Sequence, residues 1–184
     1  MRKNFGAKTY LYPMPVLIIG TYDEAGNANA MNAAWGGIAD TNQIAICLAS
    51  HKTTDNIFKN KAFTVSVGTK KMVEACDYVG LISANKEPHK MEHAHFTTTK
   101  SEFVNAPIIN ELPMSLECKF IDFDESTGLL RGEIVNVNAD ESILTNGVID
   151  PKKLEPITFD PVNNTYIVLG DVVGKAFSCG NNLK

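Results

Sequence analysis

The chain has 184 residues, a formal net charge of −4 and a pI of about 5.6, with 44% hydrophobic and 21% charged residues. This composition is typical of folded globular proteins and excludes an intrinsically disordered chain, and the length suits one domain covering residues 1–184. Lysine and arginine form no cluster that would neutralise phosphates, so we expect no nucleic-acid partner.

The beginning of the chain lacks the pattern of a targeting segment. Met1-Arg2-Lys3 is followed by polar and aromatic residues, and the apolar run Val16–Ile19 is far too short to cross a bilayer. We therefore expect a cytoplasmic protein with no membrane partner. Four cysteines without metal-ligand spacing are expected to be free and mostly buried thiols, although two disulfides remain an alternative.

The first predicted elements form a hairpin. Residues 15–23 are a strand whose apolar run Val16–Ile19 indicates burial on both faces. A turn at Glu24–Asn27 then brings Ala28–Trp35 back alongside it.

Strands and helices alternate irregularly in the next part of the chain. Ile44–Leu48 is a strand, and a helix follows to about Lys61, with Thr53 or Thr54 as its cap. Ala62–Val67 alternates like a strand with one buried face. A second helix is predicted for Lys70–Val79 from its apolar spacing.

The second half is dominated by strands. Residues 80–105 are polar and are expected to be irregular, with one or two helical turns. Long strands at 114–124 and 129–139 share a turn at Glu125–Gly128, Asp150-Pro151 opens a short helix, and Tyr166–Gly170 is a final strand. Short strands with few intervening helices predict a mainly β fold, an antiparallel barrel with peripheral helices, rather than a doubly wound parallel sheet.

Common catalytic signatures are missing from the sequence. It contains no GxSxG, HExxH, P-loop or GxGxxG motif, and Gly36-Gly37 alone does not indicate a dinucleotide-binding fold. The usual hydrolase and dehydrogenase classes are therefore excluded, and a nicotinamide cofactor would bind only transiently.

Two stretches have the composition of a ligand site. Asn29–Gly37 combines small residues, two amides and the only tryptophan, which suits a flat ring, although Trp35 as an ordinary core residue is an alternative. Ser50–Ile57 joins a strand to a helix N-terminus beside Lys52, which suits a phosphate; an ordinary capped helix is the alternative.

Two further stretches are less specific. Glu74–Gly80 is typical of a helix end with a glycine cap. His89, His93 and His95 are close enough in sequence to suggest a metal-dependent enzyme, but cysteines and carboxylates in ligand spacing are missing beside them, which favours a solvated, partly helical segment.

Taken in order, these stretches resemble the flavin reductase-like FMN-binding family, and its flavoredoxin branch in particular. The resemblance covers nearly the whole chain and implies a split β-barrel, a homodimer, and one FMN per subunit near the subunit boundary. The segments that carry it are Gly6–Lys8, Tyr12–Val16, Asn29–Gly37, Thr53–Ile57, Phe63–Ser66, Asp77–Ser83, Gly132–Val135, Gly147–Pro151 and Tyr166–Gly170.

The resemblance also implies a set of FMN-binding residues, transferred position by position. They are grouped by the part of FMN that each would contact: Asn29, Met31, Asn32, Ala33 and Trp35 at the isoalloxazine; Leu48 and Ser50 at the ring edge or ribityl chain; Lys52, Thr53 and Asn56 at the phosphate; Val65 and Ser66 closing the pocket; and Asp77, Tyr78, Ser83 and Tyr166 on the far side.

The implied chemistry belongs to the flavin, which accepts a hydride from NADH or NADPH, so no side chain needs to be an acid or base. Two other flavin-based functions stay open. One is a non-catalytic electron carrier reduced by a redox protein partner, and the other is a module that sequesters or senses flavin.

Overall fold

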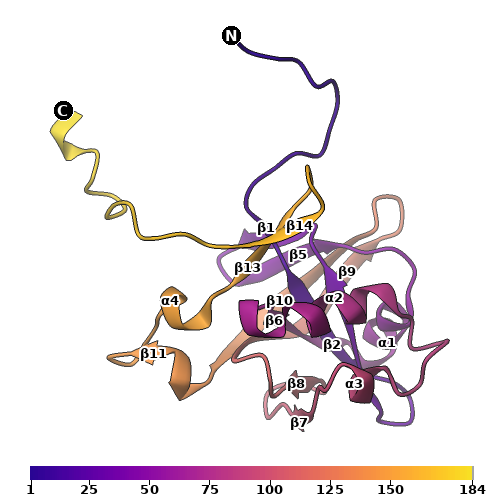
Figure 1. Cartoon of the computed structure of the whole chain (residues 1–184). Coiled ribbons are helices and arrows are strands. Elements are labelled where there is room, and N and C mark those ends of the chain that lie inside the picture. Colours follow the sequence, from indigo (N-terminus) through magenta and orange to yellow (C-terminus); the bar gives the residue numbers. More distant parts are fainter. Residues whose placement is uncertain (184) are drawn as a thin grey trace.

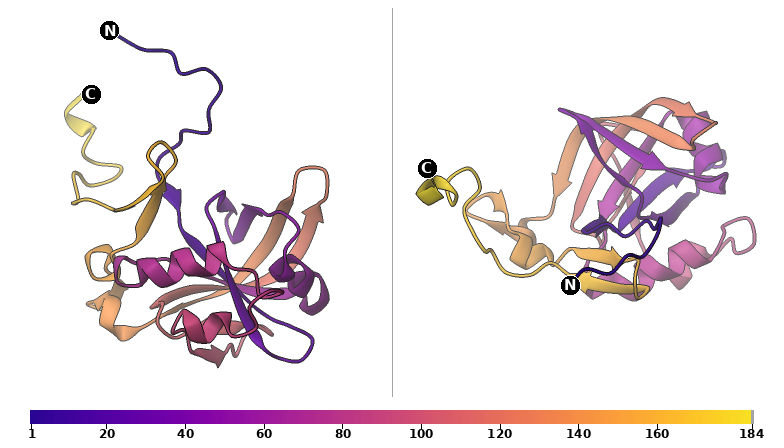
Figure 2. Two further views of the ribbon diagram at one scale, coloured as in Figure 1. Left: turned by 45° about the vertical axis from the view of Figure 1, so that its right-hand side comes forward. Right: turned by 90° about the horizontal axis from the view of Figure 1, so that it is seen from above.

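The structure, a computed structural model, describes residues 1–183 and is built around one strongly curved antiparallel sheet (Figure 1). The strand order β3-β2-β6-β9-β10-β5-β4 places β3 and β4 at opposite edges, although only Ala34 and Trp35 separate them in sequence. The sheet therefore curls until its edges approach each other, which confirms the predicted antiparallel barrel (Figure 2). The strands are β2 (Leu17–Tyr22), β3 (Ala28–Ala33), β4 (Gly36–Asp40), β5 (Gln43–Cys47), β6 (Ala62–Val67), β9 (Met114–Asp124) and β10 (Leu129–Ala139).

Strand β2 separates two hydrophobic cores. Leu17 and Ile19 point into the barrel, whereas Val16 and Ile18 pack on the opposite side with Cys76 of a covering helix. Successive side chains of a strand point to opposite faces, so this apolar run fills both cores at once. The predicted burial on both faces is confirmed.

Smaller elements surround the barrel. Beside it stands a three-stranded sheet of β1 (Met14–Pro15), β13 (Ile157–Asp160) and β14 (Thr165–Val168). The remaining elements are β7 (Thr98–Lys100) with β8 (Pro107–Ile109), β11 (Leu144–Thr145) with β12 (Val148–Ile149), α1 (Lys52–Asn60), α2 (Val73–Leu81), α3 (Lys90–His93), α4 (Pro151–Leu154), η1 (Lys70–Met72), η2 (Glu141–Ile143) and η3 (Asn181–Leu183).

Two details of the predicted strands differ from the structure. Strand β6 was expected to bury one face, but Thr64 and Ser66 on its other face are also fully buried, because β8 and the neighbouring strands cover that side. Strand β4 was not predicted. It forms because Gly36–Asp40 pairs with β5, a backbone interaction that needs no apolar pattern.

The helix start at α1 also differs from the prediction. The N-cap is His51, and no side chain caps it. Instead, Thr53 Oγ1 accepts a hydrogen bond from Asn29, and Thr54 Oγ1 donates to the Ala49 carbonyl oxygen, so neither threonine is the cap.

The cysteines are free thiols as expected, but only two of them are buried. Cys76 and Cys118 lie in the cores, whereas Cys47 and Cys179 are exposed. In the described part of the chain, α1 and α2 have only nine residues each, and no helix is long and apolar enough to span a membrane.

Both ends of the chain leave the small sheet and run outward (Figures 1 and 2). We call residues 1–13 the N-terminal arm and residues 169–183 the C-terminal arm. Every residue of the N-terminal arm is exposed, and so is nearly every described side chain of the C-terminal arm.

Candidate functional site

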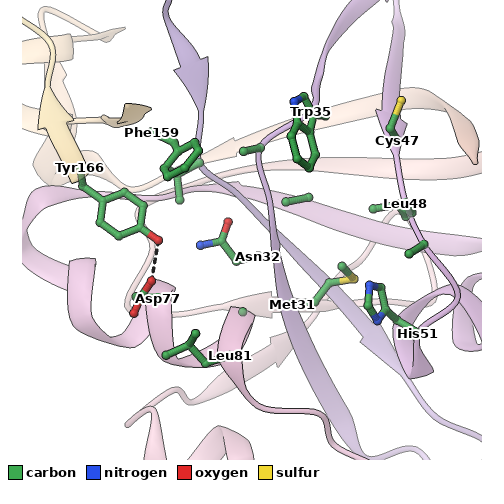
Figure 3. A pocket seen from close by; sticks show the side chains of 15 residues that line it. Met31, Asn32, Trp35, Cys47, Leu48, His51, Asp77, Leu81, Phe159 and Tyr166 are labelled. Atoms are coloured by element: carbon green, nitrogen blue, oxygen red, sulfur yellow. Dashed lines mark hydrogen bonds between the residues drawn. The ribbon is translucent and has the colours of Figure 1, made fainter. Parts of the chain in front are cut away.

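A cleft of about 410 Å³ opens where the two edges of the sheet meet α2 and the small sheet (Figure 3). Apolar side chains make most of its wall, with polar groups at one side. The residues that line it are Val16, Met31, Asn32, Ala33, Ala34, Trp35, Cys47, Leu48, Ala49, His51, Asp77, Gly80, Leu81, Phe159 and Tyr166.

Trp35 stands at the rim of this cleft, in the two-residue link between β3 and β4. Its carbonyl oxygen accepts a hydrogen bond from the Cys47 backbone at 2.8 Å, which fixes the link against β5. The side chain is 58% exposed, so the alternative of an ordinary core tryptophan is wrong. Ala33 and Ala34 beside it leave space for a flat ring to approach the backbone.

The opposite wall carries a hydrogen-bonded pair. The Tyr166 hydroxyl donates to Asp77 Oδ1 at 2.7 Å, which joins β14 to α2 (Figure 3). Burial raises the pKa of Tyr166, and the hydrogen bond to Asp77 raises it further. Nearby, Asn32 donates to the Cys76 carbonyl oxygen at 3.0 Å and is thereby held in the floor of the cleft.

A second, narrower pocket of about 180 Å³ continues from the cleft toward the N-terminus of α1. The two share Met31, Asn32, His51, Gly80 and Leu81, so they form one elongated site. At the shared boundary, a Cβ on Gly80 would lie only 3.0 Å from Asn32 Cβ, so the absence of a side chain lets α2 approach β3.

Two buried polar side chains in the narrow pocket each lack a hydrogen-bond or ion-pair partner. Asn29 is 5% exposed; its amide donates to Thr53 Oγ1 at 2.8 Å, but its Oδ1 accepts no hydrogen bond. Lys90 is 3% exposed, forms no ion pair with any described carboxylate, and has a pKa lowered to about 8 by burial. A buried acceptor and a buried cation both cost free energy unless a ligand pairs with them.

The helix N-terminus adds a third anion-binding feature. The first backbone N–H groups of α1 have no side-chain cap, and Lys52 and Thr53 of its first turn line the pocket. Free N–H groups and the helix dipole favour negative charge at this end. The elongated site is therefore apolar and wide at one end, and narrow and anion-attracting at the other.

The structure brings eleven of the sequence-predicted site residues to this elongated site. They are Met31, Asn32, Ala33, Trp35, Leu48, Asp77 and Tyr166 in the wide cleft, and Asn29, Lys52, Thr53 and Ser83 in the narrow pocket.

Two predicted residues near α1 lie outside both pockets. Ser50 is exposed in the loop before the helix. Asn56 is 2% exposed on the inward face of α1, where its amide donates to Thr21 Oγ1 at 3.0 Å. Its place in the second helical turn turns the side chain toward β2, so it ties helix to sheet.

Two predicted residues of β6 also lie outside both pockets. Val65 is fully buried in the barrel core, and Ser66 Oγ shares a 2.7 Å hydrogen bond with Ser115 Oγ of β9. Strand β6 is the third strand from the edge, so β2 and β3 separate it from the cleft.

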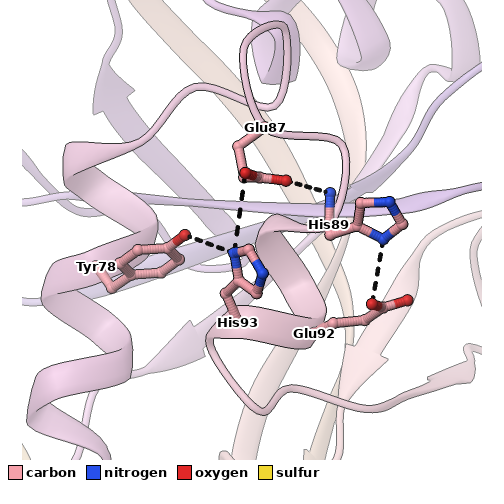
Figure 4. A network of polar contacts seen from close by, with 5 residues as sticks. All are labelled: Tyr78, Glu87, His89, Glu92 and His93. Carbon is pink, nitrogen blue, oxygen red and sulfur yellow. Dashed lines mark hydrogen bonds and ion pairs between the residues drawn. The ribbon is translucent and has the colours of Figure 1, made fainter.

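Tyr78, the remaining predicted residue, faces away from the site and toward the histidines (Figure 4). Its hydroxyl lies 3.3 Å from His93 Nδ1. His89 Nδ1 contacts Glu92 at 3.1 Å, and His93 Nδ1 lies 3.9 Å from Glu87. Among the described residues, no three potential ligands converge on a metal position, so the metal-enzyme alternative has no structural support.

Sequence reasoning missed several lining residues. His51 and Leu81 lie in stretches that the sequence analysis noted but were not named as site residues. Lys90 and Phe159 were not expected in the site, and Phe159 comes from a strand that the sequence did not predict. Lys90 directly follows His89, in the segment noted for its histidines, but nothing in that segment predicts a buried lysine.

A split antiparallel barrel with a wide apolar cleft and a narrow, anion-attracting pocket is typical of the flavin-binding split-barrel class. The model of the flavin reductase like domain matches residues 9–157, and the chain belongs to this family. Within it, the chain falls in the flavoredoxin branch.

The similar proteins include two flavoredoxins of known structure. Flavoredoxin of Desulfovibrio vulgaris (Miyazaki F) is 38% identical with a TM-score of 0.93, over 98% of this chain and 100% of that one. Flavoredoxin from Methanosarcina acetivorans is 30% identical with a TM-score of 0.87, over 100% and 98% respectively. An uncharacterized protein of Halalkalibacterium halodurans is 25% identical over 162 residues, which are 79% of this chain and 77% of that protein.

Proposed function

We propose that the protein is a cytoplasmic FMN-dependent oxidoreductase that accepts electrons from NADH or NADPH, acting as a homodimer whose subunits are single domains. The observation that carries this proposal is one elongated site in which a wide apolar cleft continues into a narrow pocket lined by Lys90, a buried cation that pairs with no described carboxylate. Few cofactors combine a planar ring, a polyol and a phosphate in that order, and FMN does.

The residues present fit each part of FMN. The ring would lie against Met31, the alanines of the β3–β4 link and Trp35. A ribityl hydroxyl would satisfy the orphaned Oδ1 of Asn29. The phosphate would meet Lys90 and the uncapped N-terminus of α1.

The chemistry of hydride acceptance and electron release comes from the bound flavin. This chain's residues orient the ring and exclude water from one of its faces. The Tyr166–Asp77 pair keeps the tyrosine protonated and holds a carboxylate beside the cleft. The exposed rim at Trp35 leaves an approach for a nicotinamide or an acceptor.

A second candidate is an electron carrier that a redox protein partner reduces. The identities of 38% and 30% to two flavoredoxins favour it. It uses the same FMN site and differs only in the source of electrons.

The experiment is an absorbance spectrum of purified protein with and without added FMN, followed by anaerobic addition of NADH and of NADPH. Bleaching of the bound flavin by NADH or NADPH at a rate compatible with turnover supports the reductase. Tight FMN binding without bleaching supports the carrier or a flavin-sequestering module, and reduction by a low-potential electron-transfer protein separates these two. Failure to bind FMN refutes the proposal.

A further inference from the structure

The wall of the wide cleft carries one negative charge. Asp77 is the only carboxylate that lines it, and no lysine or arginine of the described chain does so. Apolar and aromatic side chains make up most of the remaining wall, with Trp35 across the cleft from Phe159 and Tyr166 (Figure 3). A charge beside such a wall acts through a lower effective dielectric than it would in water, so its influence reaches into the cleft.

A hydrogen bond holds this carboxylate in place. The Tyr166 hydroxyl donates to Asp77 Oδ1 at 2.7 Å, and burial together with this bond raises the pKa of Tyr166, so the proton stays on the tyrosine. The bond joins β14 to α2, and both elements pack on the same hydrophobic core. Asp77 is therefore kept as a carboxylate at a defined place in the wall.

The two ends of the elongated site have opposite charge. The narrow pocket is lined by Lys52 and by the buried Lys90, whereas the wide cleft is lined by Asp77. This arrangement suits a ligand with a permanent anion at the narrow end and an uncharged ring at the wide end, which is the charge distribution of oxidised FMN. A hydride from NADH or NADPH brings two electrons and one proton, and it converts the neutral ring into an anion at neutral pH.

We propose that the Asp77 carboxylate disfavours the reduced, anionic ring and thereby makes the reduction potential of bound FMN more negative than that of free FMN, with Tyr166 as the residue that positions it. The proposal rests on the FMN site of the proposed function and names the residue that sets its redox behaviour. A charge near the flavin ring is one of the levers by which a protein tunes the electronics of this cofactor. Bound flavin is then a stronger reductant than free FMN, which serves a reductase and an electron carrier alike.

The test measures the reduction potential of FMN bound to the full chain, by anaerobic equilibration with a dye of known potential. Asp77→Asn removes the charge and keeps the shape of the side chain and an acceptor for Tyr166. Glu74→Gln is the matched control, because it makes the same change of charge on the same helix, while Glu74 is exposed and lines neither pocket of the site. The second readout is the affinity of each protein for oxidised and for reduced FMN, whose ratio is linked to the potential.

We expect the wild type to bind oxidised FMN more tightly than reduced FMN. Asp77→Asn should shrink this preference about tenfold, which raises the potential by about 30 mV for a two-electron couple, whereas Glu74→Gln should change neither quantity. Tyr166→Phe should raise the potential by less. In the double variant it should add nothing to Asp77→Asn, because Tyr166 acts through the carboxylate that it positions.

A second pair of variants leaves the hydrogen bond between Tyr166 and Asp77 intact. Leu81 lies one helical turn beyond Asp77, lines the same cleft and is 73% exposed, so a polar side chain there does not disturb a core. Leu81→Asp should make the potential more negative, and Leu81→Asn, which has the same shape without the charge, should not.

Three results would overturn the inference alone. An unchanged potential in Asp77→Asn and Leu81→Asp shows that a carboxylate in this wall does not act on the ring. An equal shift in Glu74→Gln shows that the overall charge of the protein is the cause. A wild-type potential at or above that of free FMN shows that the reduced ring is not disfavoured. In all three cases FMN still binds and the proposed function survives, whereas a wild type that binds no FMN overturns the proposed function and the inference together.

Discussion

Replacing the buried Lys90 by methionine should stabilise the flavin-free protein and weaken its binding of FMN. Burial lowers the pKa of Lys90 from 10.5 to about 8, which corresponds to about 3 kcal/mol at about 1.4 kcal/mol per pKa unit. Relaxation of the folded protein and solvent screening reduce this cost, so we expect Lys90→Met to gain about 1–2 kcal/mol in free energy of unfolding at pH 7.

Proton linkage determines how the stability effect of Lys90→Met changes with pH. The folded pKa of Lys90 is lowered, so the unfolded chain holds more protons than the folded chain between about pH 8 and 10.5. The wild type should gain stability as the pH rises through this window, whereas Lys90→Met should not. The advantage of the variant is therefore full at neutral pH and shrinks at alkaline pH.

FMN and riboflavin separate the electrostatic role from a merely structural one, because only FMN has the phosphate. Loss of one charge-assisted hydrogen bond costs about 1.5–3 kcal/mol, so FMN affinity should fall roughly 10- to 100-fold, while riboflavin affinity changes little. Urea unfolding and flavin fluorescence titration measure the two quantities, with the exposed Lys86→Met as control. A less stable variant, or equal losses for FMN and riboflavin, would refute the reasoning.

The remaining predictions concern binding, packing and titration. Asn29→Ala should weaken FMN and riboflavin alike by about tenfold in the same titration, since a buried acceptor for a shared hydroxyl is lost; unchanged affinities would contradict this. Gly132→Ala should lower the free energy of unfolding, measured in urea, by about 1–3 kcal/mol, because the added Cβ would lie 2.4 Å from the buried Phe63 ring. Gly37→Ala is the control and should be neutral, because nothing lies within 4 Å of the added Cβ. Burial and the hydrogen bond to Asp77 raise the pKa of Tyr166, so the stability that Tyr166 contributes is fully present below about pH 10 and is lost progressively as the pH rises further. In an absorbance titration, Tyr166→Phe should lack the last tyrosine to ionise. An unchanged titration curve would count against the Tyr166–Asp77 hydrogen bond.

The sequence predicted best those elements whose pattern is local. The strands at 114–124 and 129–139 have the predicted bounds, because two alternating runs around a good turn need no distant information. Strand β4 was missed because Gly36-Gly37 has low strand propensity, and its formation depends on β5 pairing with it across the barrel.

The residues of the candidate site also divide into those that a local sequence pattern predicts and those that depend on long-range packing. Its contiguous part, from Asn29 to Trp35, was found because small, amide and aromatic residues follow one another along one strand. Lys90 was not found, since a lysine in a polar segment normally stays in water. Its burial is decided by the packing of α3 against β3, a contact between residues some sixty positions apart that no local pattern records.

The unequal ends of the site bear on how a flavin would be held. At the narrow end, Lys90 and the Asn29 acceptor are buried and incompletely paired, so a phosphate and a polyol would recover free energy that the flavin-free protein lacks. At the wide end, Trp35 and Leu81 are mostly exposed and contribute contact without enclosure. Retention of the flavin would then depend on the narrow end that binds the phosphate. The approach of redox partners would depend on the exposed rim at the wide end.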